Sequence, residues 1–304
     1  HLIGEYNMAF SQGSRSSLSL VVESTFGTTP AGNFINIPFS STSLNMSNDV
    51  LNGTDIQADR MQRVTRLGNE RVAGDIVVDL RASEYDSLLE SAMMDTWATN
   101  VLKVGTTPKF FSIEDYAADI DQARLFTGMS AGSMGVSLAP NQMVTTTFGM
   151  VGKSMTIGQT QKTQTAAGTD VPFDAYSGDI SIGNVGSPTA SAIITALDFT
   201  IDNAAEPTFV IGDDSAPSIE AGMATVEGTM TAYFEDAALI NRYLNETLTA
   251  IQVSVSDSVN TYTFDFPSVK ITSADVGVDG PSSRMITMAF VALFDTAEAT
   301  SLKI

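Results

Sequence analysis

Two segments of alternating side chains limit the folds that are open to this chain. In residues 71–81, apolar residues occupy every second position, and the other face carries four charged side chains together with Ala73 and Val77. A period of two is typical of a β-strand with one buried face. Residues 226–234 repeat the pattern 154 positions later. The apolar faces consist of Val72, Gly74, Ile76, Val78 and Leu80 in the first segment and Val226, Gly228, Met230, Ala232 and Phe234 in the second.

A short helix is expected after each of these strands. The apolar residues at helical spacing are Tyr85, Leu88 and Leu89 after the first strand and Ile240, Tyr243 and Leu244 after the second, at an offset of 155. Ser83 can act as the N-cap of the first helix, with Asp86 three positions later. We therefore expect a mainly β fold in which a short helix packs on the sheet.

The order of further segments recurs as well. Residues 44–48 correspond to residues 199–203 at an offset of 155, and residues 143–148 correspond to residues 285–290. Each match alone is weak, because any two strands can be laid side by side. Their common order favours an internal duplication over coincidence.

The duplication suggests a division of the chain into six segments. We expect an expression-derived or upstream extension before Met8 (residues 1–7), an N-terminal arm (8–32), a first copy (33–155), a linker or inserted hairpin (156–189), a second copy (190–296) and a frayed C-terminal tail (297–304). In the arm, Leu18, Leu20 and Val22 form a strand that can join a sheet of its own chain or of a neighbour.

Composition excludes several classes of function. The chain has no cysteine, and its one histidine is residue 1, so thiolate zinc sites and His- or Cys-based catalytic groups are not expected. A net charge of −20 disfavours nucleic-acid readers and anionic membranes. There is no apolar run of 18 residues and no pattern of a signal peptide. We expect no catalytic residue, cofactor or metal site, and we interpret the acidic cluster Glu114, Asp115, Asp119 and Asp121 as a solvated turn.

The two long loops of the copies differ in charge. The basic residues of the first loop are Arg60, Arg63, Arg66 and Arg71, and the acidic residues of the second are Glu206, Asp213, Asp214 and Glu220. Two interpretations remain open: scattered surface charge, or complementary loops that meet between molecules and fix their orientation.

Residues 17–30 (SLSLVVESTFGTTP) resemble the arm that begins many tail tube (major tail) proteins of long-tailed, non-contractile bacteriophages. The shared features are a strand, a glutamate and a Gly-Thr-x-Pro turn. The order of strand, long loop, strand, short helix and strand resembles the same family. The resemblance implies a tail-tube-type β-sandwich or half-barrel with a short flanking helix, here in two tandem copies.

The resemblance also implies a function. The protein is then a structural virion protein whose rings stack into a tail tube, a negatively charged conduit for genome DNA and the tape-measure protein. Two copies per chain imply a ring of three chains with pseudo-sixfold symmetry, or of six chains if the second copy is a decoration domain. Further implied partners are tail-tip and terminator proteins. DNA passes without specific binding, no membrane is involved, and assembly takes place in the host bacterial cytoplasm. The arginine loop is then expected to contact an adjacent ring or subunit.

Three alternatives stay open at this point. One is a secreted or surface β-sandwich binding module of the adhesin kind. Another is a carboxylate-based enzyme such as a glycosidase. A sugar-binding site usually needs several aromatic side chains, however, and the chain has a single tryptophan, Trp97. The third is a tail terminator or baseplate hub protein that reuses the same fold.

Overall fold

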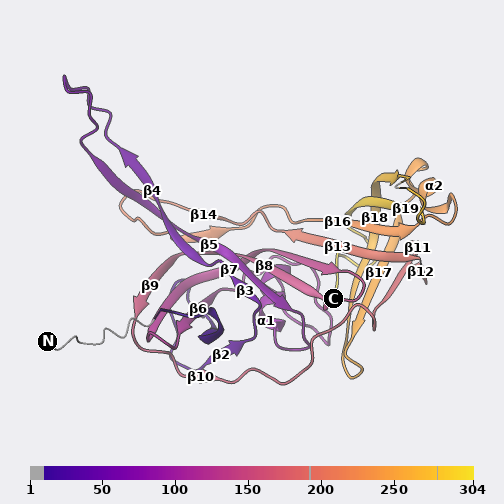
Figure 1. The fold of residues 1–304 in the computed structure, drawn as a ribbon, viewed down its shortest axis with the longest axis horizontal. Helices are drawn as coiled ribbons and strands as arrows, with labels where there is room; N and C mark the ends of the chain where they lie inside the picture. Colours follow the sequence, from indigo (N-terminus) through magenta and orange to yellow (C-terminus); the bar gives the residue numbers. More distant parts are fainter. Residues whose placement is uncertain (1–9, 192, 279) are drawn as a thin grey trace.

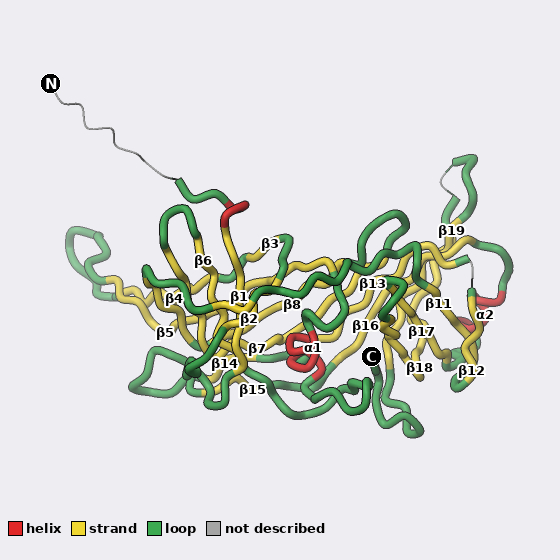
Figure 2. Tube along the Cα trace, turned by 90° about the horizontal axis from the view of Figure 1, so that it is seen from below, coloured by secondary structure: helices red, strands yellow, loops and turns green. Residues whose placement is uncertain are grey.

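The computed structural model describes residues 10–191, 193–278 and 280–304, so the extension expected at residues 1–7 lies outside the described residues. The fold is mainly β. The two α-helices among these residues are α1 (Asp86–Met93) and α2 (Ala238–Leu244), and a 3-10 turn covers Gly13–Arg15. The molecule is elongated, with α1 near its middle and α2 at one end (Figures 1 and 2).

The strands of the first half of the chain are β1 (Ser16–Val22), β2 (Phe34–Ile37), β3 (Ser41–Thr42), β4 (Asn45–Asn52), β5 (Thr65–Asp79), β6 (Phe111–Ala117), β7 (Gln122–Leu138), β8 (Thr145–Gly152), β9 (Ser154–Gly158) and β10 (Gln164–Thr165). Those of the second half are β11 (Asp179–Asn184), β12 (Ser187–Ala190), β13 (Ile194–Asp202), β14 (Glu206–Thr208), β15 (Ser218–Glu220), β16 (Thr225–Tyr233), β17 (Thr249–Ser256), β18 (Thr261–Val276) and β19 (Met285–Ala292).

A continuous row of antiparallel strands connects the two halves. Its order is β4, β5, β8, β7, β13, β16, β19 and β18. The hairpin of β4 and β5 projects from the body at one end of the molecule, and β18 lies toward the opposite end (Figure 1). The row crosses from the first half of the chain to the second where β7 pairs with β13.

Both halves use the same order of strand pairing. In the first half β4 pairs with β5, β5 with β8, β8 with β7 and β7 with β6. In the second half β13 pairs with β16, β16 with β19, β19 with β18 and β18 with β17. A helix takes the same place in the chain order of each half: α1 lies between β5 and β6, and α2 lies between β16 and β17.

Each half also has two β-bulges at places that match those of the other half. The register of β6 with β7 shifts between Phe111 and Ile113, and that of β17 with β18 shifts between Thr249 and Ile251. A second shift lies at residues 131–133 of β7 and at residues 271–273 of β18. A bulge inserts one residue and bends its strand, so each half bends its sheet at the same two points.

One sequence correspondence is shifted by two positions. Ile76 pairs with Phe148, whereas Met230, its counterpart, pairs with Met288, so β8 corresponds to β19 from Thr145 and Met285 onward. The expected match of residues 143–148 with residues 285–290 is therefore wrong in register. A shift of two keeps every side chain on the same face, and the alternating pattern cannot detect it.

The two helices differ in burial. Leu88 and Leu89 of α1 are fully buried, as expected, but Tyr243 and Leu244 of α2 are 36% and 65% exposed. The capping prediction is wrong: Tyr85 stands at the N-cap of α1 without a side-chain bond, and Ser83 has φ 64°, its backbone N–H donating to the Tyr262 hydroxyl.

The C-terminal tail, the segment between the two expected copies and the N-terminal arm all pack against the rest of the chain. The tail expected to fray is anchored, because Leu302 is fully buried and the Ile304 N–H donates to the Leu102 carbonyl. In the segment expected to be a linker or hairpin, β11 pairs with β12 and β17, and Phe173 is fully buried. Strand β1 adds to its own chain, between β2 and β6.

Candidate assembly surface

The exposed face of the strand row is acidic. Strand pairing places its carboxylates side by side with Thr, Ser and Gly positions of neighbouring strands; for example, Asp198 lies opposite Ser137 and Thr229. The carboxylates on this face are Asp75, Asp79, Asp198, Asp202, Glu227 and Asp275. The opposite face carries the buried apolar residues, so the row has one core face and one exposed face on which short polar and acidic side chains predominate, with Arg71 of β5 as a basic exception.

Part of this acidic face is hollowed. One shallow depression is lined by Asp75, Ser133, Gly135, Thr147 and Asp198, and a second continues from it along Asp202 and Glu206. Short side chains keep the hollow open, because Gly135 and Gly149 contribute no side chain. A smooth, concave surface with negative charge repels a polyanion and offers it few groups to bind.

The arginine residues lie on the projecting hairpin of β4 and β5. Arg63 forms an ion pair with Asp59, and Arg71 pairs with Asp49 while its guanidinium lies 5.2 Å from the centre of the Phe209 ring. These pairs are solvent-exposed and contribute about 0–1 kcal/mol each. Arg63 and Arg71 are therefore held by local acids of the same hairpin, whereas no ion pair is found for Arg60 or Arg66 among the described residues.

The acidic loop of the second half touches this hairpin within one chain. The Glu70 N–H donates to the Asp214 carbonyl at 2.8 Å. Burial, followed by the charges of Asp214 and Asp213, raises the pKa of Glu70. Backbone donation from Ser215 lowers the pKa of Asp213. Across the described part of the chain, no ion pair joins Arg60, Arg63, Arg66 or Arg71 to Glu206, Asp213, Asp214 or Glu220.

The same hairpin exposes large apolar side chains. Val50, Leu51, Ile56, Met61 and Leu67 are between 57% and 100% exposed. Val64 of the same hairpin is 47% exposed. Scattered exposed apolar residues are ordinary, but six on one projecting hairpin are typical of a surface that another chain covers. The sequence analysis considered only the charges of this segment and did not identify its exposed apolar side chains.

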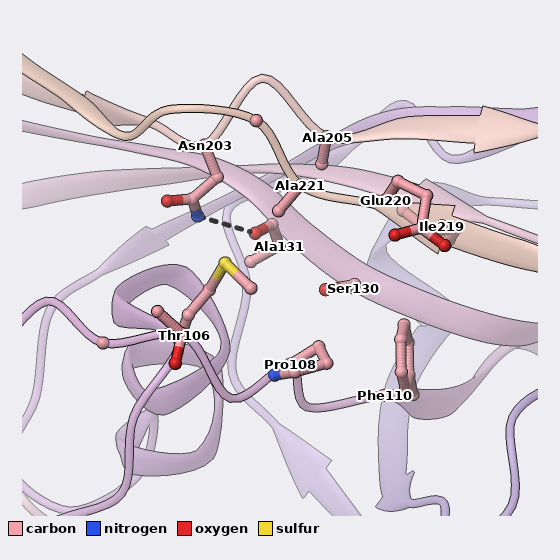
Figure 3. Close-up of a pocket in the computed structure, with 13 residues that line it drawn as sticks. Thr106, Pro108, Phe110, Ser130, Ala131, Asn203, Ala205, Ile219, Glu220 and Ala221 are labelled. Carbon is pink, nitrogen blue, oxygen red and sulfur yellow. Dashed lines mark hydrogen bonds between the residues drawn. The ribbon is translucent and has the colours of Figure 1, made fainter.

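The joint between the halves is the second feature that the sequence analysis did not identify. Asn203, only 2% exposed, donates from Nδ2 to the carbonyl of Ala92 at the end of α1 and to that of Ala131, and its N–H donates to the Gly132 carbonyl. Figure 3 shows the Asn203 amide directed at the Ala131 carbonyl, across the pocket from Thr106 and Pro108. Asn48 corresponds to Asn203 at the offset of 155, but this match does not reveal the burial of Asn203, because Asn48 is only half-buried in its own chain.

The N-terminal arm is a structural part of the first half. Leu18 and Leu20 are buried in the core, whereas Val22, at the end of β1, is 39% exposed. The buried carboxylate of Glu23 accepts hydrogen bonds from the N–H of Gly27 and Gly128 and from the Ser112 hydroxyl. It thereby holds the turn at Gly27, which has φ 70°.

The acidic cluster is not a solvated turn throughout. Glu114 and Asp115 lie in β6 and are 1% and 8% exposed, with Asp115 paired to Arg124 and Glu114 accepting from the Lys162 N–H. Asp119 and Asp121 are in the exposed turn. Within the described ranges, no group of three or more potential ligands is placed to hold a metal ion. Nor does any described helix have the length and apolar character to cross a membrane.

Comparison with known proteins gives one family. A family model described as "Phage tail tube protein" matches residues 13–292, which is most of the chain. Among curated proteins, none matches.

Proposed function

The chain belongs to the phage tail tube protein family and is a structural protein of the phage tail, and from this premise we propose that it forms rings that stack into the tube, with the acidic face of the strand row lining the channel. The observation that carries the proposal is this face, on which six carboxylates lie among Thr, Ser and Gly. A channel of this kind lets DNA pass because it repels phosphates and has few groups that bind bases.

The chain is a tandem duplication of one tail tube unit in this proposal. Identical pairing order in the two halves supports it, as do the two bulges at matching positions. Each chain then supplies two of six units, and three chains complete a ring with pseudo-sixfold symmetry. A ring of six chains is the alternative.

The projecting hairpin makes the contact between rings. Its six exposed apolar residues and its arginines support this role, since both need a partner surface. The acidic loop around Asp213 and Asp214 of another molecule is the proposed partner of Arg60, Arg63 and Arg66. Contacts of this head-to-tail kind do not close, so rings add until a terminator stops growth. The tape-measure protein and DNA occupy the channel, tail-tip proteins start the tube, and assembly takes place in the bacterial cytoplasm.

Negative-stain electron microscopy of the concentrated purified protein tests this function. The expected result is rings with a central hole that stack into tubes. A protein that stays monomeric at all concentrations, in the presence and absence of tail-tip proteins, contradicts the proposal and favours the binding-module alternative.

A further inference from the structure

We propose that a second copy of this chain docks with the free edge of β4 onto the free edge of β18, in the register that β13 makes with β7 inside one chain. The inference rests on the proposed ring, and it adds the residue pairs that join one chain to the next.

Both edges lack a second partner among the described residues. Strand β4 pairs with β5 on one side, and β18 beyond Val269 pairs with β19 on one side. Unpaired edges expose backbone N–H and C=O groups that another strand can satisfy. The two edges end the same strand row at opposite ends of the molecule (Figure 1), so their pairing joins chains head to tail. Unlike the contacts between stacked rings, this contact generates a ring because the rotation from chain to chain closes.

The internal joint gives the register. Met46 corresponds to Ile201, because Met46 pairs with Val72 as Ile201 pairs with Val226. By the same reasoning Ala274 corresponds to Met134, since the two pair with Met288 and Phe148.

Within the chain Ile201 lies opposite Met134, and Thr200 lies opposite Gly135. Between chains, Met46 therefore lies opposite Ala274, and Asn45 lies opposite Asp275.

The side chains at the two edges fit this pairing. Met46 and Ala274 are half-buried and pack against the core cluster, so the joint continues the apolar layer from one chain into the next. Asn45 and Asp275 are exposed and continue the polar face. A neutral amide opposite a carboxylate avoids the repulsion of two like charges across the strands.

Asn48 takes the place of Asn203 in this joint. A left-handed residue with φ 52° follows each helix, Met94 directly after α1 and Glu246 one residue beyond Asn245, and each donates its N–H three residues back, to Ser91 and Tyr243. In this alignment the Leu244 carbonyl corresponds to that of Ala92, so the match of Leu244 with Leu89 expected at the offset of 155 is three positions out. Asn203 donates to the Ala92 carbonyl, and Asn48 of the second copy is placed to donate to the Leu244 carbonyl. In its own chain the Asn48 amide is 3.5 Å from the Gly68 carbonyl, a long contact that it can give up.

Exposure of α2 supports the same conclusion. The end of α1 faces the segment that follows β13, because Ile219 of β15 and Ala221 line one pocket together with Met94 and Pro108. Tyr243 and Leu244 at the end of α2 have no such cover and are exposed. In this joint within the ring, the segment after β4 of the next chain is the counterpart of that loop, in addition to the contact between rings proposed for the hairpin.

Disulfide trapping tests the register, and the absence of native cysteine makes it clean. Asn45→Cys and Asp275→Cys are introduced into separate proteins, which are mixed and oxidised under assembly conditions. A covalent dimer is expected from the mixture, and a ladder of higher multimers from the double variant. The matched control pairs Asn45→Cys with Ser273→Cys, two residues out of register. It should give about tenfold less product, because disulfides need Cα atoms within about 7 Å.

Each outcome decides the inference. The register is overturned, while the tube function stands, if the protein forms tubes but residues 45 and 275 form no disulfide. The same holds if the shifted control gives more covalent dimer than the 45–275 pair. If the wild-type protein forms no tubes, the proposed function itself fails.

The Asn48→Ala variant provides a second readout that needs no cysteine. It should melt like wild type as a monomer and assemble more slowly. Assembly at the wild-type rate would contradict the role of Asn48.

Discussion

The Nδ2 of Asn203 donates a hydrogen bond of 2.8 Å to the backbone carbonyl of Ala92, which ties the second half of the chain to the end of helix α1. The bond is buried, and the Oδ1 atom of the same amide has no hydrogen-bond partner. Asn203 therefore connects the halves while carrying one unsatisfied oxygen.

Replacing Asn203 by Ala should destabilise the protein by about 1–2 kcal/mol. The Ala92 and Ala131 carbonyls lose a buried donor, and loss of the unpaired Oδ1 offsets part of the cost. Urea unfolding of the unassembled protein measures the change. Asn48→Ala is the matched control and should leave the unfolding free energy unchanged; equal effects of the two variants would contradict the account.

Glu23 should matter more for stability than an exposed glutamate. Its carboxylate accepts three hydrogen bonds in the interior, so Glu23→Gln should cost about 1.5–3 kcal/mol. Glu227→Gln, on the exposed face of β16, should stay within about 0.5 kcal/mol of wild type. Thermal unfolding of both variants tests this difference, and an unchanged melting temperature for Glu23→Gln would show that the turn does not depend on it.

The two helices should respond differently to truncation. Leu89→Ala opens a cavity in the core and should cost about 2–5 kcal/mol. Leu244→Ala removes an exposed side chain and should change the stability of the monomer by less than about 0.5 kcal/mol. Leu244→Ala should instead reduce assembly, which light scattering follows. Normal assembly of that variant would show that α2 stays uncovered in the ring.

Charge reversal of the hairpin should stop tube growth without unfolding the chain. Arg60→Glu, Arg63→Glu and Arg66→Glu together place negative charge against the proposed acidic partner. Circular dichroism checks the fold and electron microscopy counts tubes. Adding Asp213→Lys and Asp214→Lys should restore growth in part. Wild-type tubes from the triple variant at both low and high salt would mean that these arginines are surface charge.

Reversing the acidic face should make the tube bind DNA. In tubes of the Asp75→Lys, Asp198→Lys and Glu227→Lys variant, DNA should be retained at low salt and released as salt rises, because phosphate contacts release counterions. Asn and Gln at the same positions form the control and should retain far less. If the Lys and wild-type tubes retain DNA equally in a filter assay, this face does not line the channel.

The positions of the strands could be predicted from the sequence, because burial of one face makes apolar and polar side chains alternate along a strand. Val72, Ile76, Val78 and Leu80 were predicted to be buried on one side of a strand, and they are. The two-residue shift between β8 and β19 escaped prediction for the same reason, since a period of two is blind to it. Bulges at residues 131–133 and 271–273 add single residues that no alternation reveals.

The charges of the assembly surface could be predicted from the sequence, but the contacts that these charged side chains make could not. The basic and acidic loops could be found by counting residues, but the pairing of Arg63 with Asp59 depends on the hairpin geometry. Asn203 looked like any polar residue at the end of a strand. Its burial depends on helix α1, which lies more than a hundred residues earlier in the chain.

The central claim is that three duplicated chains form each ring of the tube. Electron microscopy of the tubes, with end-on views averaged without imposed symmetry, tests it most directly. The account predicts three strong repeats with a weaker sixfold modulation around a central hole. Six identical repeats per ring, one chain each, would contradict it.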